Sequence, residues 1–149
     1  MIKFKTVKEI EDKVQPNTFI TLTVKQGIRD RLGAYLPGSE DVYDRVIRSL
    51  LSKVHRRLYG KRAWRRRRHQ LPNLTVLERG RDGRWHIHSC LRRPTHVTIN
   101  ELRDIVEECW SKSDWYMPRY EIEEYRGGGV SYILKDGQDA ILVGPTYFE

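Results

Sequence analysis

Two histidines that lie two residues apart are the first candidates for chemistry. His86 and His88 stand on either side of Ile87 in the stretch 85–91, which alternates in the manner of a strand. On a strand both imidazoles would project from one face while Ile87 points into the core, so the pair could chelate a metal ion. The same alternation also fits a strand whose polar face is simply wet, so the pair alone does not establish a metal site.

Glu78 is a third candidate ligand because of its position before a turn. Residues 81–83 (Arg-Asp-Gly) fit a three-residue hairpin loop in which Gly83 is left-handed, and this register places Glu78 directly opposite His86. Two imidazoles and a carboxylate suit Mn²⁺ or Mg²⁺ in phosphate chemistry, although zinc or nickel could bind the imidazoles more tightly. The alternative is an exposed strand carboxylate among arginines.

Tyr132 and Lys135 are a candidate nucleophile and its supporting cation. They are three residues apart after Gly127–Gly129, so on a helix they would share one face. As a nucleophile a tyrosine needs a neighbouring cation to favour the phenolate and a metal to activate the phosphorus. The alternative is that Tyr132 is packing and Lys135 is a solvated side chain.

A basic stretch around one tryptophan is suited to holding phosphates, with one stacking contact. Its members are Lys61, Arg62, Trp64, Arg65, Arg66, Arg67 and Arg68. The alternative is a solvated surface segment. The net charge of the chain is +8, which attracts polyanions without choosing between DNA, RNA and acidic lipid.

The 149 residues fit one domain, residues 1–149, with 38% hydrophobic and 32% charged residues. No apolar run is long enough to span a bilayer, and residues 1–5 lack a signal core. Cys90 and Cys109 have no CxxC spacing, so they predict neither a disulfide framework nor a thiolate zinc site. We therefore expect a cytoplasmic protein with no membrane partner.

The elements that must position these residues follow from periodicity and capping signals. Strands are expected at 17–25, 74–78, 85–91, 119–125 and 140–143, and helices at 39–59, 98–112 and 130–135, with a possible short helix in the first sixteen residues. This order predicts an α+β, ferredoxin-like or RRM-like sandwich, with an antiparallel sheet of about five strands. Helices would cover one face and leave the other free for a ligand.

Three segments together resemble the HUH endonucleases, specifically the replication initiators of rolling-circle replicons. Residues 19–23 (FITLT) resemble the first motif, Trp85–His88 with Glu78 the metal-binding second, and Tyr132–Lys135 the third. The resemblance implies that Tyr132 attacks a phosphodiester in single-stranded DNA, leaving a 3′-hydroxyl and a 5′-phosphotyrosine. It also implies DNA contacts by Thr21 and Thr23 of the first motif.

The resemblance further implies a single-tyrosine enzyme, because Gly128 and Asp136 lie four residues before and after Tyr132. No P-loop is found, so no helicase domain is expected. The implied partners are single-stranded DNA at an origin or hairpin and host replication proteins such as a helicase. The implied location is the cytoplasm of a bacterial, archaeal or phage-infected cell, or the nucleus for a eukaryotic virus.

Two other interpretations stay open. The chain could be a non-catalytic RRM-like module that binds single-stranded nucleic acid through aromatic side chains, although this gives no reason for Glu78, His86 and His88 to converge. It could also be an HUH transposase or relaxase relative, although related single-tyrosine transposases typically place a Gln where Asp136 stands.

Overall fold

The computed structural model describes residues 6–60 and 71–148 and has an α+β architecture, as the sequence predicts. Its helices are α1 (Val7–Val14), α2 (Glu40–Tyr59), α4 (Ile99–Trp110), α5 (Gly129–Ile133) and the short 3-10 helix η1 (Gln138–Ala140). Its strands are β1 (Thr18–Val24), β2 (Gly27–Arg29), β3 (Tyr35–Pro37), β4 (Asn73–Arg79), β5 (Trp85–Leu91) and β6 (Tyr116–Glu124).

Four strands form the central antiparallel sheet in the order β4-β5-β1-β6. β2 and β3 pair separately as a two-stranded ribbon, which the sequence analysis did not predict. The strand expected at 140–143 is absent from the described residues, because only a single bridge joins Ile141 to Val76. The sheet therefore has four strands rather than about five.

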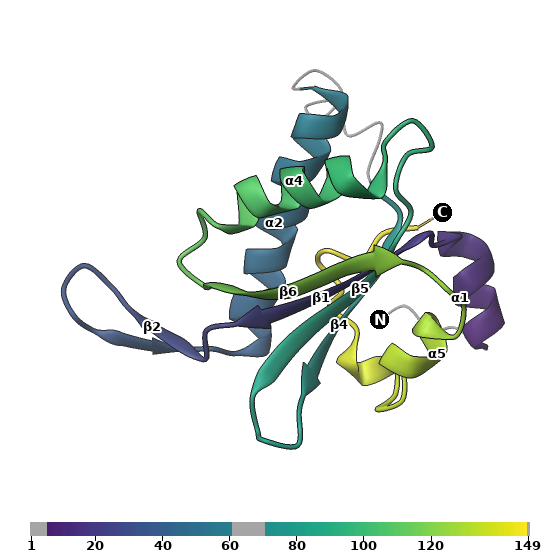
Figure 1. Cartoon of the computed structure of the whole chain (residues 1–149). Coiled ribbons are helices and arrows are strands. Elements are labelled where there is room, and N and C mark those ends of the chain that lie inside the picture. Colours follow the sequence, from purple (N-terminus) through teal and green to yellow (C-terminus); the bar gives the residue numbers. More distant parts are fainter. Residues whose placement is uncertain (1–5, 61–70, 149) are drawn as a thin grey trace.

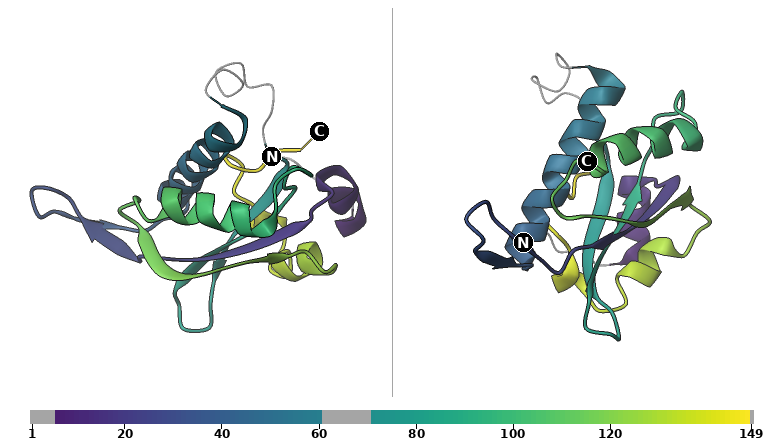
Figure 2. Two further views of the ribbon diagram at one scale, coloured as in Figure 1. Left: turned by 45° about the horizontal axis from the view of Figure 1, so that its top comes forward. Right: turned by 60° about the vertical axis from the view of Figure 1, so that its left-hand side comes forward.

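Both long helices begin at the predicted caps. The Ser39 hydroxyl accepts a hydrogen bond from Val42 N (3.3 Å), and the Thr98 hydroxyl accepts one from Glu101 N (3.1 Å). α2 and α4 cover one face of the sheet (Figures 1 and 2). This face holds the main core, which includes Ile20, Leu22, Ile87 and Leu91 from the strands.

The opposite face is not wholly free, which corrects the expectation that helices cover one face only. α1 and α5 pack against it, and Ile10 and Val130 join Leu74, Val76 and Cys90 in a second apolar cluster. Figure 2 shows α5 on the side of the sheet away from α2 and α4. Only the part of this face near the β4–β5 turn stays open.

The β4–β5 hairpin has the predicted register. Gly80 N donates to Arg84 O (2.8 Å), Gly83 is left-handed (φ +78°), and Glu78 pairs with His86 across the strands. The three-residue loop is therefore confirmed. None of the described helices combines the length and the apolar character that crossing a membrane requires.

Candidate active site

A chain of hydrogen bonds crosses three strands on the open part of the sheet. Glu78 on β4 lies with its Oε2 2.6 Å from Nε2 of His88 on β5, and Nδ1 of the same ring lies 3.1 Å from the Thr21 hydroxyl on β1. The pairing of Thr21 with His88 across β1 and β5 brings these side chains to one face. Both ring nitrogens of His88 are therefore held.

The protonation of this chain follows from its surroundings. Burial lowers the pKa of His88, and the attraction of Glu78 offsets this only in part, so the ring is neutral near pH 7. Burial raises the pKa of Glu78, but contacts with Lys135 and His88 outweigh it and keep the pKa below its usual value. An ionised carboxylate accepts only, so His88 Nε2–H donates to Glu78 and the Thr21 hydroxyl donates to Nδ1.

Lys135 links this chain to the predicted nucleophile. Its Nζ lies 2.8 Å from Glu78 Oε1 and 4.3 Å from the centroid of the Tyr132 ring. The hydrogen bond with Glu78 raises the pKa of Lys135, so the ammonium form is stable beside the phenol. The Tyr132 ring also meets His88 edge-on, with 6.2 Å between the ring centroids.

α5 is fixed in place by packing at its start. A Cβ on Gly129 would lie only 2.6 Å from the Tyr125 ring, so a larger residue does not fit there. The Tyr125 hydroxyl accepts a hydrogen bond from Val130 N (3.2 Å) and donates to a Glu11 carboxylate oxygen on α1 (2.9 Å). These contacts leave Tyr132 on the outer side of α5, with 53% of its surface exposed.

His86 lies on the same face as His88 but is held less firmly. Its ring lies close to the turn, where a Cβ on Gly80 would be 3.4 Å from two of its ring atoms. Within residues 6–60 and 71–148 we find no hydrogen bond to this ring. His86 is therefore a candidate ligand that stands outside the bonded chain.

In this arrangement the described His, Cys, Asp and Glu side chains form no ready group of three metal ligands. The donor set nevertheless fits a divalent cation. Glu78 Oε2 and His88 Nε2 are both acceptors once the proton between them is removed, and a metal ion can take the place of that proton. Thr21 suits either state, since its hydroxyl can donate to Nδ1 or accept from it.

The roles of Thr21 and the other predicted DNA-contacting residues divide in three. Thr21 touches His88, which the sequence analysis missed; the threonine pairs with the motif histidine across two strands, and alternation alone does not reveal that bond. Thr23 pairs with His86 on the same open face. The predicted residues Lys61, Arg62, Trp64 and Arg65–Arg68 lie outside the described residues.

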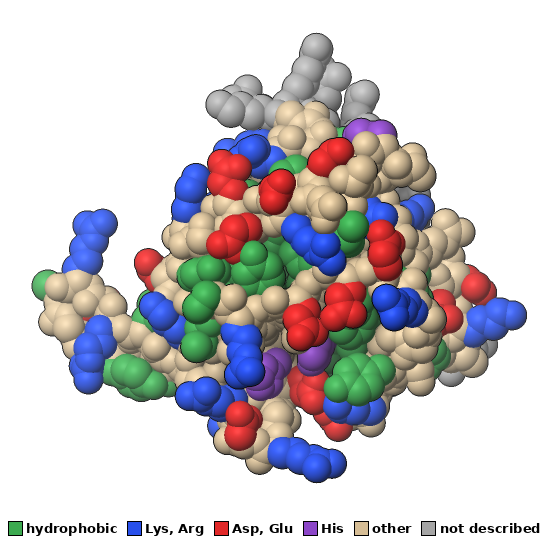
Figure 3. Space-filling view, viewed as in Figure 1, with side chains coloured by type: hydrophobic (Ala, Val, Ile, Leu, Met, Phe, Trp, Pro, Cys, Tyr) green, Lys and Arg blue, Asp and Glu red, His purple; other side chains and the backbone are tan. Residues whose placement is uncertain are grey.

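The charge on the open face differs between its two sides. Glu121 on β6 pairs with Thr21, and Glu123 pairs with Phe19, so two carboxylates follow the β6 edge. Arg81 and Arg84 stand at the turn of the β4–β5 hairpin and are exposed. Figure 3 shows histidine side chains at the surface above this turn, with acidic and basic side chains around them.

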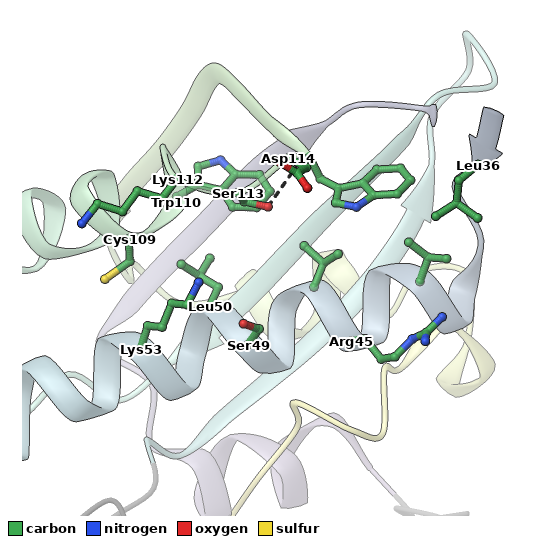
Figure 4. A pocket seen from close by; sticks show the side chains of 13 residues that line it. Leu36, Arg45, Ser49, Leu50, Lys53, Cys109, Trp110, Lys112, Ser113 and Asp114 are labelled. Atoms are coloured by element: carbon green, nitrogen blue, oxygen red, sulfur yellow. Dashed lines mark hydrogen bonds between the residues drawn. The ribbon is translucent and has the colours of Figure 1, made fainter. Parts of the chain in front are cut away.

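A separate pocket of about 460 Å³ lies on the opposite face of the sheet, between α2 and α4 (Figure 4). Its floor includes Leu50, Trp110 and Trp115, and Lys53 and Lys112 stand at its rim. None of the predicted site residues lines this pocket, so it is not part of the candidate active site.

The fold and the site define a class of small α+β proteins that carry a histidine pair and a tyrosine on one sheet face. Residues 17–139 match the family model of the ORF2-type replication-associated proteins, and the chain belongs to this family. The match covers all three predicted motifs and supports a role in the initiation of replication. No curated protein and no solved structure matches the chain.

Proposed function

We propose that the chain is a metal-dependent enzyme that nicks and rejoins single-stranded DNA to start rolling-circle replication, as single-tyrosine HUH endonucleases do. The supporting observation is that Lys135 contacts both the Tyr132 ring and Glu78, which is bonded to His88. A nucleophile, a cation and two metal-ligating side chains thus meet on one open face. Membership of the replication-associated family makes DNA the natural substrate.

In the proposed reaction the Tyr132 oxygen attacks the scissile phosphorus. The new O–P bond replaces the bond to the 3′ oxygen, so the phosphate stays on the enzyme as a 5′-phosphotyrosine, and the phenol proton is balanced by the one gained at the 3′-hydroxyl. Lys135 remains protonated and stabilises the developing phenolate by its charge. Rejoining is the reverse reaction.

Glu78, His86 and His88 would hold Mn²⁺ or Mg²⁺, which when bound draws charge from a phosphate oxygen. Thr21 keeps the His88 ring in one orientation through Nδ1, as partners of metal-ligating histidines do. Lys135 neutralises the Glu78 carboxylate on its other oxygen. These contacts limit how far the ligands must move when the ion enters.

The shape and charge of the open face favour a flexible strand. A single strand can bend its backbone into a surface bordered by α5, whereas paired bases would hold the phosphates away. The carboxylates of Glu121 and Glu123 repel phosphates from the β6 edge, so the strand should leave towards Arg81 and Arg84. We propose an origin or hairpin as the target, and a host helicase as a partner in the cytoplasm or the infected nucleus.

The direct test is a cleavage assay with Mn²⁺ and end-labelled oligonucleotides that cover candidate origins. Single strands and melted hairpin loops should be cut, the intact duplexes of the same sequences should not, and a chelator should stop the reaction. Glu78→Ala should weaken metal affinity. Binding without cleavage across the whole set would instead support the non-catalytic, RRM-like module.

A further inference from the structure

The β2–β3 ribbon projects from the sheet and leaves apolar side chains uncovered. Figure 1 and the left view of Figure 2 both show it extending away from the helices. Leu32 at its tip is 95% exposed, and Tyr35 and Leu36 on β3 are 59% and 45% exposed. Exposed apolar residues on an extended element often mark a contact with a partner.

The tip is a built turn. The Asp30 carboxylate accepts hydrogen bonds from the backbone N–H groups of Leu32 and Ala34, both at 2.9 Å. Gly33 is left-handed (φ +82°), and its carbonyl accepts a bond from the Arg29 guanidinium at 2.9 Å. Leu32 is therefore presented at a fixed position and binds without a large ordering cost.

The base of the ribbon is fixed to the strand that carries the histidines. The Gln26 amide bonds both backbone groups of Trp85, accepting from its N (2.7 Å) and donating to its O (3.3 Å). The Tyr43 hydroxyl on α2 donates to Lys25 O at 2.8 Å. The ribbon therefore keeps a defined direction relative to His86 and His88.

The ribbon is also positively charged. The Arg29 guanidinium lies 5.9 Å from the centroid of the Tyr35 ring, and Arg31 is exposed beside Leu32 with no ion pair to any residue the structure describes. The single acidic residue of the tip, Asp30, is occupied by the turn. A partner of this surface should thus carry negative charge as well as apolar groups, which describes DNA.

We propose that the β2–β3 ribbon binds double-stranded DNA next to the single-stranded segment at the active site. A two-stranded ribbon fits the major groove, where Arg31 reaches a phosphate and Leu32 contacts base edges. Arg29 is six residues beyond Thr23, at most about 20 Å of chain, which corresponds to about six base pairs. This inference rests on the proposed function and adds a hairpin stem to its substrate.

The test measures binding of the full chain, with a chelator present, to two fluorescent probes. One is a single strand; the other carries the same strand next to a stem of about one helical turn. Arg31→Gln should weaken stem binding several-fold, leave single-strand binding unchanged, and reduce the salt slope for the stem probe by about 0.9. Lys53→Gln on α2 removes the same charge elsewhere and should change neither probe.

Leu32→Ser separates the apolar contact from the ionic one. It should weaken stem binding several-fold without changing the salt slope, because it removes no charge. Equal losses on both probes, or none, would overturn the proposal. So would a dimer in sedimentation that Leu32→Ser breaks while stem affinity stays the same, which would make the ribbon an interface between two copies.

The binding assay is independent of catalysis. If wild-type protein prefers the stem probe and Arg31→Gln removes the preference, the ribbon proposal stands even if no oligonucleotide is nicked. If nicking is found and the preference is absent, only the ribbon proposal fails.

Discussion

The two faces of the central sheet use the same three strands for different tasks. Ile87 points under α2 and α4 and is 1% exposed, whereas His86 and His88 on either side of it point to the opposite face. β1 divides in the same way, with Leu22 in the core and Thr21 bonded to His88. Alternation by one residue therefore separates the residues that stabilise the fold from those that form the site.

The site face itself is divided again. Its covered part packs Leu74, Val76 and Cys90 against α1 and α5, and its open part carries Glu78 and His88. α5 is anchored by the covered part and presents Tyr132 at the border with the open part. The second apolar cluster thus has a role in positioning the proposed nucleophile.

Tyr132→Phe should give the largest effect on catalysis. The change removes one exposed oxygen and almost no packing, so the melting temperature should stay within about a degree of wild type. Cleavage of single-stranded DNA should fall by at least about 1000-fold, since the nucleophile is lost. A variant that cleaves at the wild-type rate would remove Tyr132 from the mechanism.

The two histidines should separate chemistry from stability. His86→Ala and His88→Ala should each lower the cleavage rate by at least about 100-fold, because each removes a metal ligand. Only His88→Ala should also destabilise the fold, by about 1–3 kcal/mol, since it deprives Glu78 and Thr21 of partners in a mostly buried chain. Metal titration and thermal melts check both parts. Equal melting temperatures for the two variants would contradict the bonded chain.

Ile87→Ala tests the opposite face at the residue between the histidines. It should lower the free energy of unfolding by about 2–5 kcal/mol, because it leaves a cavity beneath α2 and α4. Metal affinity of the folded fraction, measured well below the melting temperature, should stay near wild type. A large loss of metal affinity with little loss of stability would mean that the two faces are not separate.

Thr21→Val should give the smallest of these effects. The shape is nearly kept while the hydroxyl that holds His88 Nδ1 is lost, so metal affinity should fall by about 10- to 100-fold. Thr23→Val is the matched control, since Thr23 lies on the same strand and face and, among the described residues, pairs with His86 without a hydrogen bond to its ring. The same loss in both variants would mean that the hydroxyl of Thr21 has no special role.

Local signals in the sequence were enough for several of these features. The Ser39 and Thr98 caps, the stripe of α2 and the loop at 81–83 depend on residues near one another in the chain, and the structure has all of them. The register then follows, because a three-residue loop allows only one pairing of Glu78.

Features that depend on distant contacts were not predicted. The packing of α1 on the sheet joins residues more than sixty positions apart, and the Thr21–His88 bond spans 67 positions. The β2–β3 ribbon has short strands without clear alternation, and only Asp30 and Gly33 mark its turn. A larger weight on that Asp and Gly pair would have predicted the turn.

The central claim is a covalent bond between Tyr132 and the 5′ phosphate of the cut strand. The most direct measurement is to incubate the protein with Mn²⁺ and a cleavable oligonucleotide, digest the adduct and identify the modified peptide by mass spectrometry. The account predicts that the nucleotide is attached to Tyr132, and that a free 3′-hydroxyl is released in equal amount. Cleavage products with no adduct, or an adduct on another residue, would contradict it.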